Sequence, residues 1–279
     1  HAHELAAVLI EPIQSRYPDN RPLEFLREVR KITEESGTVM IFDEVITGFR
    51  VHQGGAQAMY GIQADLAAYG KIVGGGMPIG VVAGKGKFMD AIDGGWWQFG
   101  DKSIPEAELT FFAGTFVRHP LALAAVKASL THLKEQGPQL QERTNAKTTK
   151  LANELNAFFE GSGVPIRIRH YSSWYRFDYP NDLTYASLLF FHLLEKGIYI
   201  REGTQNCFVS TAHSEEDLAQ VVQAVKESVW ELQEAGFFPS RDGGGPNGSR
   251  LSSGRDSMPV KKKILPAPAA TPRQFLLTE

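Results

Sequence analysis

The stretch DLAAYGKIVGGGMPIG, residues 65–80, places one lysine between a short apolar run and three consecutive glycines. The run ending at Tyr69 is typical of a buried strand in a parallel sheet. The glycines at 74–76 let the backbone adopt positive φ and approach a ligand closely, at a cost of up to ~1 kcal/mol each. We therefore expect Lys71 to lie at the end of a strand, beside a ligand.

Short apolar runs alternate with amphipathic stretches throughout the first third of the chain, which is the pattern of βαβ units in an α/β fold with a largely parallel sheet. A helix is expected at 21–36, with Asn20 as its N-cap and Gly37 at its end. Strands are expected at four places: 6–10, 38–42, 65–69 and 79–84.

From Pro120 onward the pattern changes to that of a small α+β domain. The expected elements are helices at 121–136, 139–161, 185–197 and 214–235, and strands at 166–170, 174–179 and 207–211. Residues 239–279 are rich in glycine, serine and proline, and are expected to be a flexible linker. The predicted organisation is therefore 1–125, the end of a large domain; 126–238, a small domain; and 239–279, a linker.

The composition excludes several classes of function. The 29 basic and 32 acidic residues give a net charge of -3, so no strong field attracts nucleic acid or a membrane surface. The single cysteine excludes an internal disulfide framework and favours the cytosol. No apolar run approaches the ~18 residues that a membrane span requires, and no signal peptide is visible. His1 and His3 lack a cluster of further ligands, so no metal site is expected.

A second motif, IFDEVITGFR at 41–50, places Asp43 directly after an apolar run. In open α/β sheets ligands bind outside the carboxyl ends of the strands, so Asp43 and Lys71 are expected to present opposite charges to one crevice. A salt bridge, or two unrelated surface residues, is the alternative. The glycines do not form a nucleotide motif: Ile79 stands where a dinucleotide fingerprint needs glycine, and Gly86 where a phosphate loop needs serine or threonine.

Three motifs taken together carry a resemblance to a known family. IFDEVITGFR, the lysine of YGKIVGGGMPIG (69–80) and FFAGTFVRHPLALAA (111–125) resemble the class III, fold-type I pyridoxal-phosphate aminotransferases, and more closely the glutamate-1-semialdehyde aminomutase-like branch. The resemblance covers about residues 5–238. It implies the C-terminal part of a large, mostly parallel-sheet domain followed by a small α+β domain.

The resemblance also implies a role for each motif residue. Lys71 would form the Schiff base with the cofactor and later shuttle the Cα proton. Asp43 would pair with the pyridinium nitrogen and Val45 would pack on the ring. Gly114 and Thr115 would bind the phosphate of the cofactor. In this family the phosphate bound in this way belongs to the cofactor of the neighbouring subunit, which implies a homodimer.

Other features of the sequence remain open or depart from the family. Glu11 also matches a family motif but equally suits a loop-organising role, and His119 replaces an asparagine and is expected to pack or cap locally. Cys207 is expected to be a small buried hydrophobe.

Family members are longer at the N-terminus, where they carry a glycine/serine phosphate loop and a ring-stacking aromatic residue. The chain is therefore expected to be a fragment that is inactive alone.

The segments at 14–35, 116–125 and 206–218 further resemble aminotransferase domains of mixed polyketide synthase and non-ribosomal peptide synthetase megaenzymes, and RQFLLTE (273–279) resembles the approach to a condensation domain. This implies transamination of a β-keto acyl thioester on an acyl carrier protein, with glutamate or glutamine as amino donor. Two alternatives remain: a free-standing aminomutase or ω-aminotransferase acting on a small substrate, and a truncated domain with only a docking role.

Overall fold

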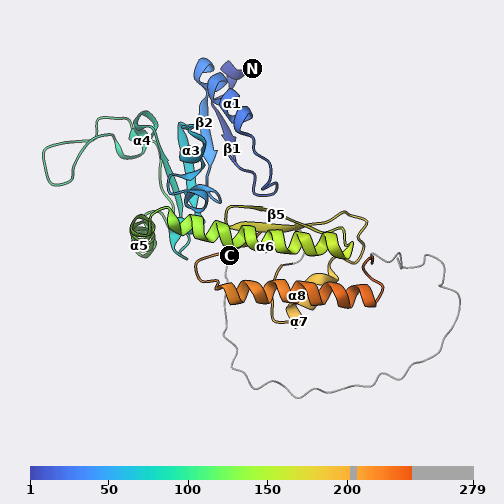
Figure 1. Ribbon diagram of the computed structural model, residues 1–279. Coiled ribbons are helices and arrows are strands. Elements are labelled where there is room, and N and C mark those ends of the chain that lie inside the picture. Colours follow the sequence, from blue (N-terminus) through green and yellow to red (C-terminus); the bar gives the residue numbers. More distant parts are fainter. Residues whose placement is uncertain (202–205, 241–279) are drawn as a thin grey trace. The chain divides into compact units, whose positions relative to one another are not determined.

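A computed structural model of the chain describes residues 1–201 and 206–240 (Figure 1). Most of the predicted linker, from residue 241 to the end, lies outside the described residues and so does the RQFLLTE segment. The described residues belong to one compact unit, which contains two sheets.

The first sheet has the strand order β1-β2-β3-β4. Its strands are β1 (Ala7–Ile10), β2 (Val39–Asp43), β3 (Leu66–Gly70) and β4 (Gly80–Gly84). The first three are parallel to one another and β4 is antiparallel to β3, which confirms the mostly parallel sheet. Around them lie η1 (Ala2–Glu4), α1 (Leu23–Ser36), α2 (Gly48–Val51), α3 (Gly55–Tyr60), η2 (Lys71–Gly74) and α4 (Gly86–Asp93).

Helix α1 packs its apolar side on the first sheet. Leu26 of the helix is fully buried in one cluster with Met40 and Phe42 of β2. Gly37 ends the helix in the left-handed conformation, φ 73°, as predicted. The predicted N-cap is wrong: Pro22 occupies that position and the helix begins at Leu23. Asn20 instead donates its amide N–H to the carbonyl of Tyr17, so it belongs to the preceding turn.

The second sheet is antiparallel, with the order β5-β6-β7. Its strands are β5 (Arg167–Tyr171), β6 (Trp174–Asp178) and β7 (Cys207–Phe208), and its helices are α5 (Pro120–Gln136), α6 (Gln139–Ser162), α7 (Leu188–Glu195) and α8 (Glu215–Glu234). Figure 1 shows the long helices α6 and α8 running beside one another, and both contribute to the largest hydrophobic core. The domain boundary predicted at 125 falls inside α5 and stays a prediction.

The two sheets are joined through a small buried cluster. Trp174 of β6 is fully buried against Ile13, Val51 and Ala56, which belong to the first half of the chain. A residue of the second sheet thus packs directly on the segment that follows Asp43. None of the helices in the described part of the chain is long and apolar enough to cross a membrane.

Candidate functional site

The carboxyl ends of β2 and β3 form the edge at which the predicted residues lie. The strands are parallel neighbours in which Asp43 aligns with Ala68, and the amide of Glu44 donates to the Ala68 carbonyl at 2.9 Å. Asp43 is the last residue of β2, and Lys71 follows the last residue of β3. Parallel strands end on the same side of a sheet, so both residues belong to one edge.

Lys71 has an unusual backbone and an uncommitted amine. Its φ of 49° lies in the left-handed region, which is rare outside glycine and tends to occur at functional sites. The side chain is exposed, and within the described residues its Nζ has no ion pair or hydrogen-bond partner. The nearby lysines differ: Lys85 pairs with Asp65 at 2.7 Å, and Lys87 lies over the ring of Phe88.

Asp43 is oriented by the turn that follows it. Its Oδ1 accepts the amide N–H of Val45 at 3.1 Å, whereas its Oδ2 has no donor among the described residues. Val45 lies against the end of β3, because a Cβ added to Gly70 would meet its Cγ1 at 3.4 Å. Val45 therefore sits between the strand end bearing Asp43 and the one leading to Lys71.

The buried side chain of Glu44 holds this turn in place, a role that the sequence did not predict. Its carboxylate is buried and accepts the Thr47 hydroxyl at 2.7 Å and the amides of Ala56 and Gln57 at 3.0 and 3.2 Å. A buried carboxylate that accepts three hydrogen bonds holds α2 and the start of α3 to the end of β2. The sequence did contain a signal for this role. Glu44 directly follows Asp43, and successive side chains of an extended chain point to opposite sides, so only one of the two acids can face the ligand.

Two of the three glycines after Lys71 lie against protein where the sequence suggested a ligand, and a Cβ added to Gly74 would lie 3.0 Å from Ile79 Cγ2. Gly75 and Gly76 do adopt positive φ, 57° and 92°. However, a Cβ added to Gly75 would lie 2.3 Å from the Ser129 hydroxyl of α5. The glycine at 75 thus allows close contact with a helix, while nothing lies within 4 Å of a Cβ added to Gly76.

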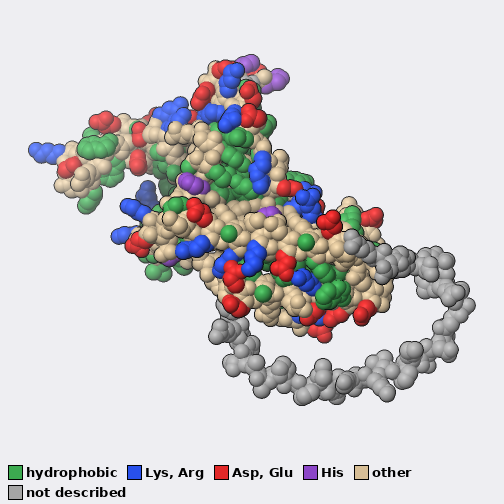
Figure 2. Space-filling view, in the orientation of Figure 1, with side chains coloured by type: hydrophobic (Ala, Val, Ile, Leu, Met, Phe, Trp, Pro, Cys, Tyr) green, Lys and Arg blue, Asp and Glu red, His purple; other side chains and the backbone are tan. Residues whose placement is uncertain are grey.

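Gly114 and Thr115 are exposed and lie in the segment that leads into α5. Figure 1 shows that the chain between α4 and α5 extends away from the first sheet, and Figure 2 shows hydrophobic side chains gathered on it. The exposed large hydrophobic residues of this segment are Trp96, Trp97, Phe99, Ile104, Leu109, Phe111, Phe112, Phe116 and Val117. An apolar surface of this kind is typical of a protein interface. The phosphate-binding roles of Gly114 and Thr115 stay predictions.

The structure shows the surroundings of Glu11 and His119, which the sequence left open, and of Cys207. Glu11 accepts the Ser15 amide at 2.9 Å and so organises its loop. His119 occupies the N-cap position of α5 without a side-chain capping bond. Burial raises the pKa of the Cys207 thiol to about 12, so it is an unreactive thiol beside Tyr175.

Comparison with known proteins identifies the family. The model of the class-III aminotransferases matches residues 1–229. The chain belongs to the class-III aminotransferase family. It is 35% identical over 240 residues to a glutamate-1-semialdehyde 2,1-aminomutase of Archaeoglobus fulgidus, covering 81% of this chain and 54% of the relative.

Solved structures of transaminases share the fold. A transaminase with PLP bound superposes with a TM-score of 0.71 at 28% identity, covering 85% of this chain and 54% of the other. A β-phenylalanine aminotransferase from Variovorax paradoxus gives a TM-score of 0.70 at 28% identity, covering 86% and 55%. The chain thus has the fold-type I transaminase architecture and spans about half the length of the relatives it matches.

The residues at the edge of the first sheet fit pyridoxal phosphate. The cofactor needs an amine for its aldehyde and an anionic acceptor for its ring nitrogen. Lys71 Nζ and Asp43 Oδ2 are the two groups at this edge that lack protein partners within the described residues. Lys71 supplies the amine for the aldehyde, and Asp43 supplies the carboxylate for the ring nitrogen.

Proposed function

We propose that the full-length protein is a pyridoxal-phosphate-dependent aminotransferase that converts a carrier-bound β-keto acyl thioester to the β-amino acyl thioester. The observation that carries transamination is the pair of uncommitted groups, Lys71 Nζ and Asp43 Oδ2, at neighbouring strand ends of a class-III fold. The single cysteine supports a cytosolic location.

Each residue has a distinct task in this proposal. When bound, the cofactor supplies an electron sink that stabilises negative charge at the substrate Cα. Lys71 would hold the cofactor at its aldehyde carbon and would move the proton at the substrate Cα, as a general acid and base. Asp43 holds the proton on the ring nitrogen, and the Val45 amide keeps that carboxylate oriented. Val45 packs on the ring face.

We further propose that the protein acts as a homodimer. Gly114 and Thr115 would hold the cofactor phosphate of the partner subunit through a backbone amide and a hydroxyl. The exposed apolar side chains between α4 and α5 support this proposal, because a second subunit would cover them. Exposure of Thr115 at the end of this segment leaves it free to reach a neighbouring site.

The tethered β-keto substrate rests on two supports. One is the resemblance to aminotransferase domains of megaenzymes. The other, which bears on the β position of the amine and not on the carrier, is the structural likeness to the β-phenylalanine aminotransferase. The proposed amino donor is glutamate or glutamine.

The test is intact-mass analysis of an acyl carrier protein loaded with a β-keto acyl group. It is incubated with the full-length protein, cofactor and isotope-labelled glutamate or glutamine, and the label is expected on the tethered acyl group. Transfer of label only to a small diffusible acceptor would contradict the tethered substrate while preserving transamination. No transfer to any acceptor, although the cofactor binds, would contradict both.

A free-standing aminomutase or ω-aminotransferase is the second candidate. It is favoured by the 35% identity to the aminomutase of Archaeoglobus fulgidus. Glutamate 1-semialdehyde, supplied as a substrate in the same assay, distinguishes the two. The third reading, a docking domain without catalysis, requires that the full-length protein bind no cofactor.

A further inference from the structure

The segment that directly follows Asp43 is a continuous series of helical turns. The amide of Gly48 donates to the Glu44 carbonyl at 2.9 Å, and the amide of Val51 donates to the Thr47 carbonyl at 3.0 Å. Bonds of this spacing are those of an α-helix, and here they run from the end of β2 to the end of α2. These turns therefore connect Asp43 to whatever holds α2.

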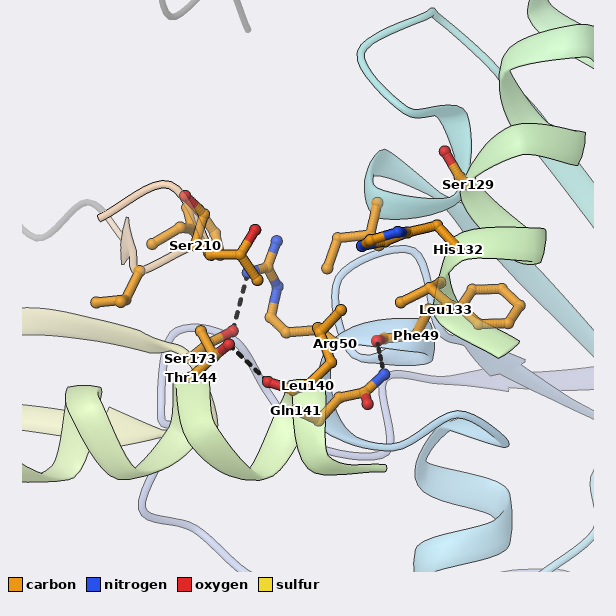
Figure 3. Close-up of a pocket in the computed structure, with 14 residues that line it drawn as sticks. Phe49, Arg50, Ser129, His132, Leu133, Leu140, Gln141, Thr144, Ser173 and Ser210 are labelled. Atoms are coloured by element: carbon orange, nitrogen blue, oxygen red, sulfur yellow. Dashed lines mark hydrogen bonds between the residues drawn. The ribbon is translucent and has the colours of Figure 1, made fainter. Parts of the chain in front are cut away.

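The second half of the chain holds α2 through hydrogen bonds. Arg50 Nη1 donates to the Ser173 hydroxyl at 3.1 Å, and Gln141 Nε2 donates to the Phe49 carbonyl at 3.0 Å (Figure 3). Ser172 Oγ lies 3.1 Å from the Arg50 carbonyl oxygen. Each of these contacts joins residues at least 92 positions apart in the sequence. The turn between β5 and β6 and the start of α6 thus fix the place of α2.

Packing supports this connection on one side only. On the other side Phe49, Arg50 and Ser173 line a cavity of about 290 Å³, together with residues of α5 and α6 (Figure 3). Protein interiors are close-packed, and a void leaves the groups that line it without van der Waals partners on that side. The position of α2 beside the cavity therefore depends on the hydrogen bonds made by Arg50.

Arg50 costs free energy to bury, because its neighbours are neutral. Its guanidinium contacts the Ser173 hydroxyl and lies 4.3 Å from the centre of the Phe208 ring, and it forms no ion pair within the described residues. Burial lowers the pKa of Arg50 to about 10. Apolar side chains can often replace a buried charge without loss of stability, whereas polar contacts can specify one arrangement. Arg50 is therefore better suited to fixing a geometry than to stabilising the fold.

Ser172 has the same unusual backbone as Lys71. Its φ is 50°, and that of Lys71 is 49°. Glycine adopts such a φ without strain, and a strained residue persists only where its surroundings impose the conformation. What serine adds is a hydroxyl, which lies beside the Arg50 carbonyl and 2.7 Å from Asn145 Oδ1 of α6. The strain at this turn is thus accompanied by contacts that tie Arg50 to the second half of the chain.

We propose that Arg50 is a positioning residue for Asp43, a role that rests on the proposed function of Asp43 in holding the cofactor ring nitrogen. The turn formed by Ser172 and Ser173 holds Arg50, and the helical turns between Arg50 and Asp43 then set where the carboxylate lies. Asp43 Oδ1 accepts the amide of Val45 at 3.1 Å, so the carboxylate follows the course of these turns. Arg50 itself touches neither cofactor nor substrate.

The test is a double-mutant cycle in the full-length protein, freed of cofactor and titrated with pyridoxal phosphate while visible absorbance is recorded. Arg50→Met should weaken binding about tenfold, because a hydrogen bond from a charged group is lost. Asp43→Asn should weaken it at least as much. Since Arg50 acts through Asp43, adding Arg50→Met to Asp43→Asn should change the dissociation constant by less than about twofold.

Arg169→Met is the matched control. Arg169 also joins the two halves of the chain, through ion pairs with Asp19 at 2.9 Å and Asp178 at 2.7 Å, and both partners lie outside the turns that follow Asp43. This variant should bind pyridoxal phosphate as the unaltered protein does, whatever it loses in thermal stability.

Two further measurements separate positioning from stability. Ser172→Gly relieves the strained φ while removing the hydroxyl, so it should keep the thermal midpoint and still weaken cofactor binding by about threefold or more. In the loaded protein, Arg50→Met and Asp43→Asn should both raise the pH at which the visible absorbance changes. The reason is that a ring without its nitrogen proton withdraws less charge from the lysine nitrogen. Arg169→Met should leave that pH unchanged.

The outcomes distinguish this proposal from the role of Asp43 on which it rests. Equal weakening by Arg50→Met with and without Asp43→Asn would overturn the positioning role, and so would unchanged binding in both Arg50→Met and Ser172→Gly. If Arg50→Met does not fold, Ser172→Gly takes its place in the cycle. If Asp43→Asn itself changes neither cofactor binding nor the absorbance, the proposed role of Asp43 is contradicted together with that of Arg50.

Discussion

Lys71 combines a strained backbone with an amine that has no hydrogen-bond or ion-pair partner in the described part of the chain. A non-glycine residue in the left-handed region costs of order 1–3 kcal/mol and persists only when its surroundings impose it. Here Gly70 is extended on one side and the 3-10 turn η2 begins on the other. The fold therefore holds the lysine in one place while its amine stays available.

We predict that Lys71 alone among the lysines is labelled when the cofactor-loaded full-length protein is reduced with borohydride. Its amine has no competing partner within the described residues, whereas Lys85 is ion-paired with Asp65. Peptide mapping should find the pyridoxyl group on the peptide containing Lys71, and Lys87→Ala should leave this result unchanged. A label on Lys85 or Lys87 would contradict the assignment.

For Asp43, we predict that the Asn variant folds normally but loses turnover by about two orders of magnitude or more, because each pKa unit of lost stabilisation of the ring proton is 1.36 kcal/mol. The amide is nearly isosteric and its oxygen can still accept the Val45 N–H. Steady-state kinetics of the full-length protein provides the measurement, with thermal unfolding as the control. Near-normal turnover would place Asp43 outside the site.

At the scale of elements, short helices carry the residues that surround the site. Helices α2 and α3 have four and six residues and lack side-chain N-caps, so propensity alone would not sustain them. The buried carboxylate of Glu44 accepts the amides of Ala56 and Gln57 and substitutes for a cap at the start of α3. Gly55, with φ 69°, lets the backbone pass against that carboxylate.

We predict that Gly55→Ala destabilises the protein by about 3 kcal/mol or more, through backbone strain added to overpacking. An added Cβ would lie 2.5 Å from Glu44 Oε1, which is held by its own hydrogen bonds and cannot move cheaply. Gly61→Ala is the matched control, because Gly61 has nearly the same φ, 66°, and nothing within 4 Å. Urea unfolding that gave equal losses for both variants would show that the contact with Glu44 does not matter.

Asp65 ties three elements together at the start of β3. It accepts the amide of Met40 at 2.9 Å and pairs with Arg30 of α1 and with Lys85 at 2.9 and 2.7 Å. Burial by itself raises the pKa of this carboxyl, but the hydrogen bonds from Lys85, Met40 and Arg30 outweigh it and lower the pKa to about 2. The folded protein therefore prefers the ionised form more than the unfolded chain does.

A pH dependence follows from this difference. The stabilisation by Asp65, about 2 kcal/mol from the shift, is complete above the unfolded pKa of 3.8 and is lost as pH falls toward 2. Urea unfolding of the protein across this window should show the loss, and Asp65→Asn should be less stable at neutral pH with a flatter profile. An unchanged slope in the variant would assign the acid sensitivity to other carboxyls.

At the scale of the whole molecule, the residues proposed to bind the cofactor come from two kinds of surface. Asp43, Val45 and Lys71 lie at the edge of one sheet, whereas Gly114 and Thr115 lie on the segment with exposed apolar side chains. This separation suits a site completed by a second subunit.

We predict that mixing Lys71→Ala and Thr115→Ala subunits of the full-length protein restores activity, because half of the sites in a heterodimer then contain both intact residues. Mixing Lys71→Ala with Asp43→Asn is the control: both residues belong to the same edge, so no site becomes intact. Activity assays after demonstrated subunit exchange provide the measurement. If the first pair gives no recovery, Thr115 does not act across the dimer.

The sequence by itself determined the larger elements and the motif positions. Short continuous apolar runs located the four strands of the first sheet, because both faces of such strands are buried, and period-3.6 patterns located the long helices. The strand-end positions of Asp43 and Lys71 followed from the same patterns. The family resemblance, confirmed by the match over residues 1–229, supplied the chemistry.

Only the tertiary structure decided what lies around those positions. The burial of Glu44, the hydrogen bond from Arg50 to Ser173 and the contact of Gly75 with Ser129 depend on groups far apart in the chain, which no local period encodes. The short helices α2 and α3 were missed for the same reason, since a buried carboxylate rather than their own residues stabilises them. Local patterns specify which face is buried, but the partner of each polar atom is chosen by the packing of distant segments.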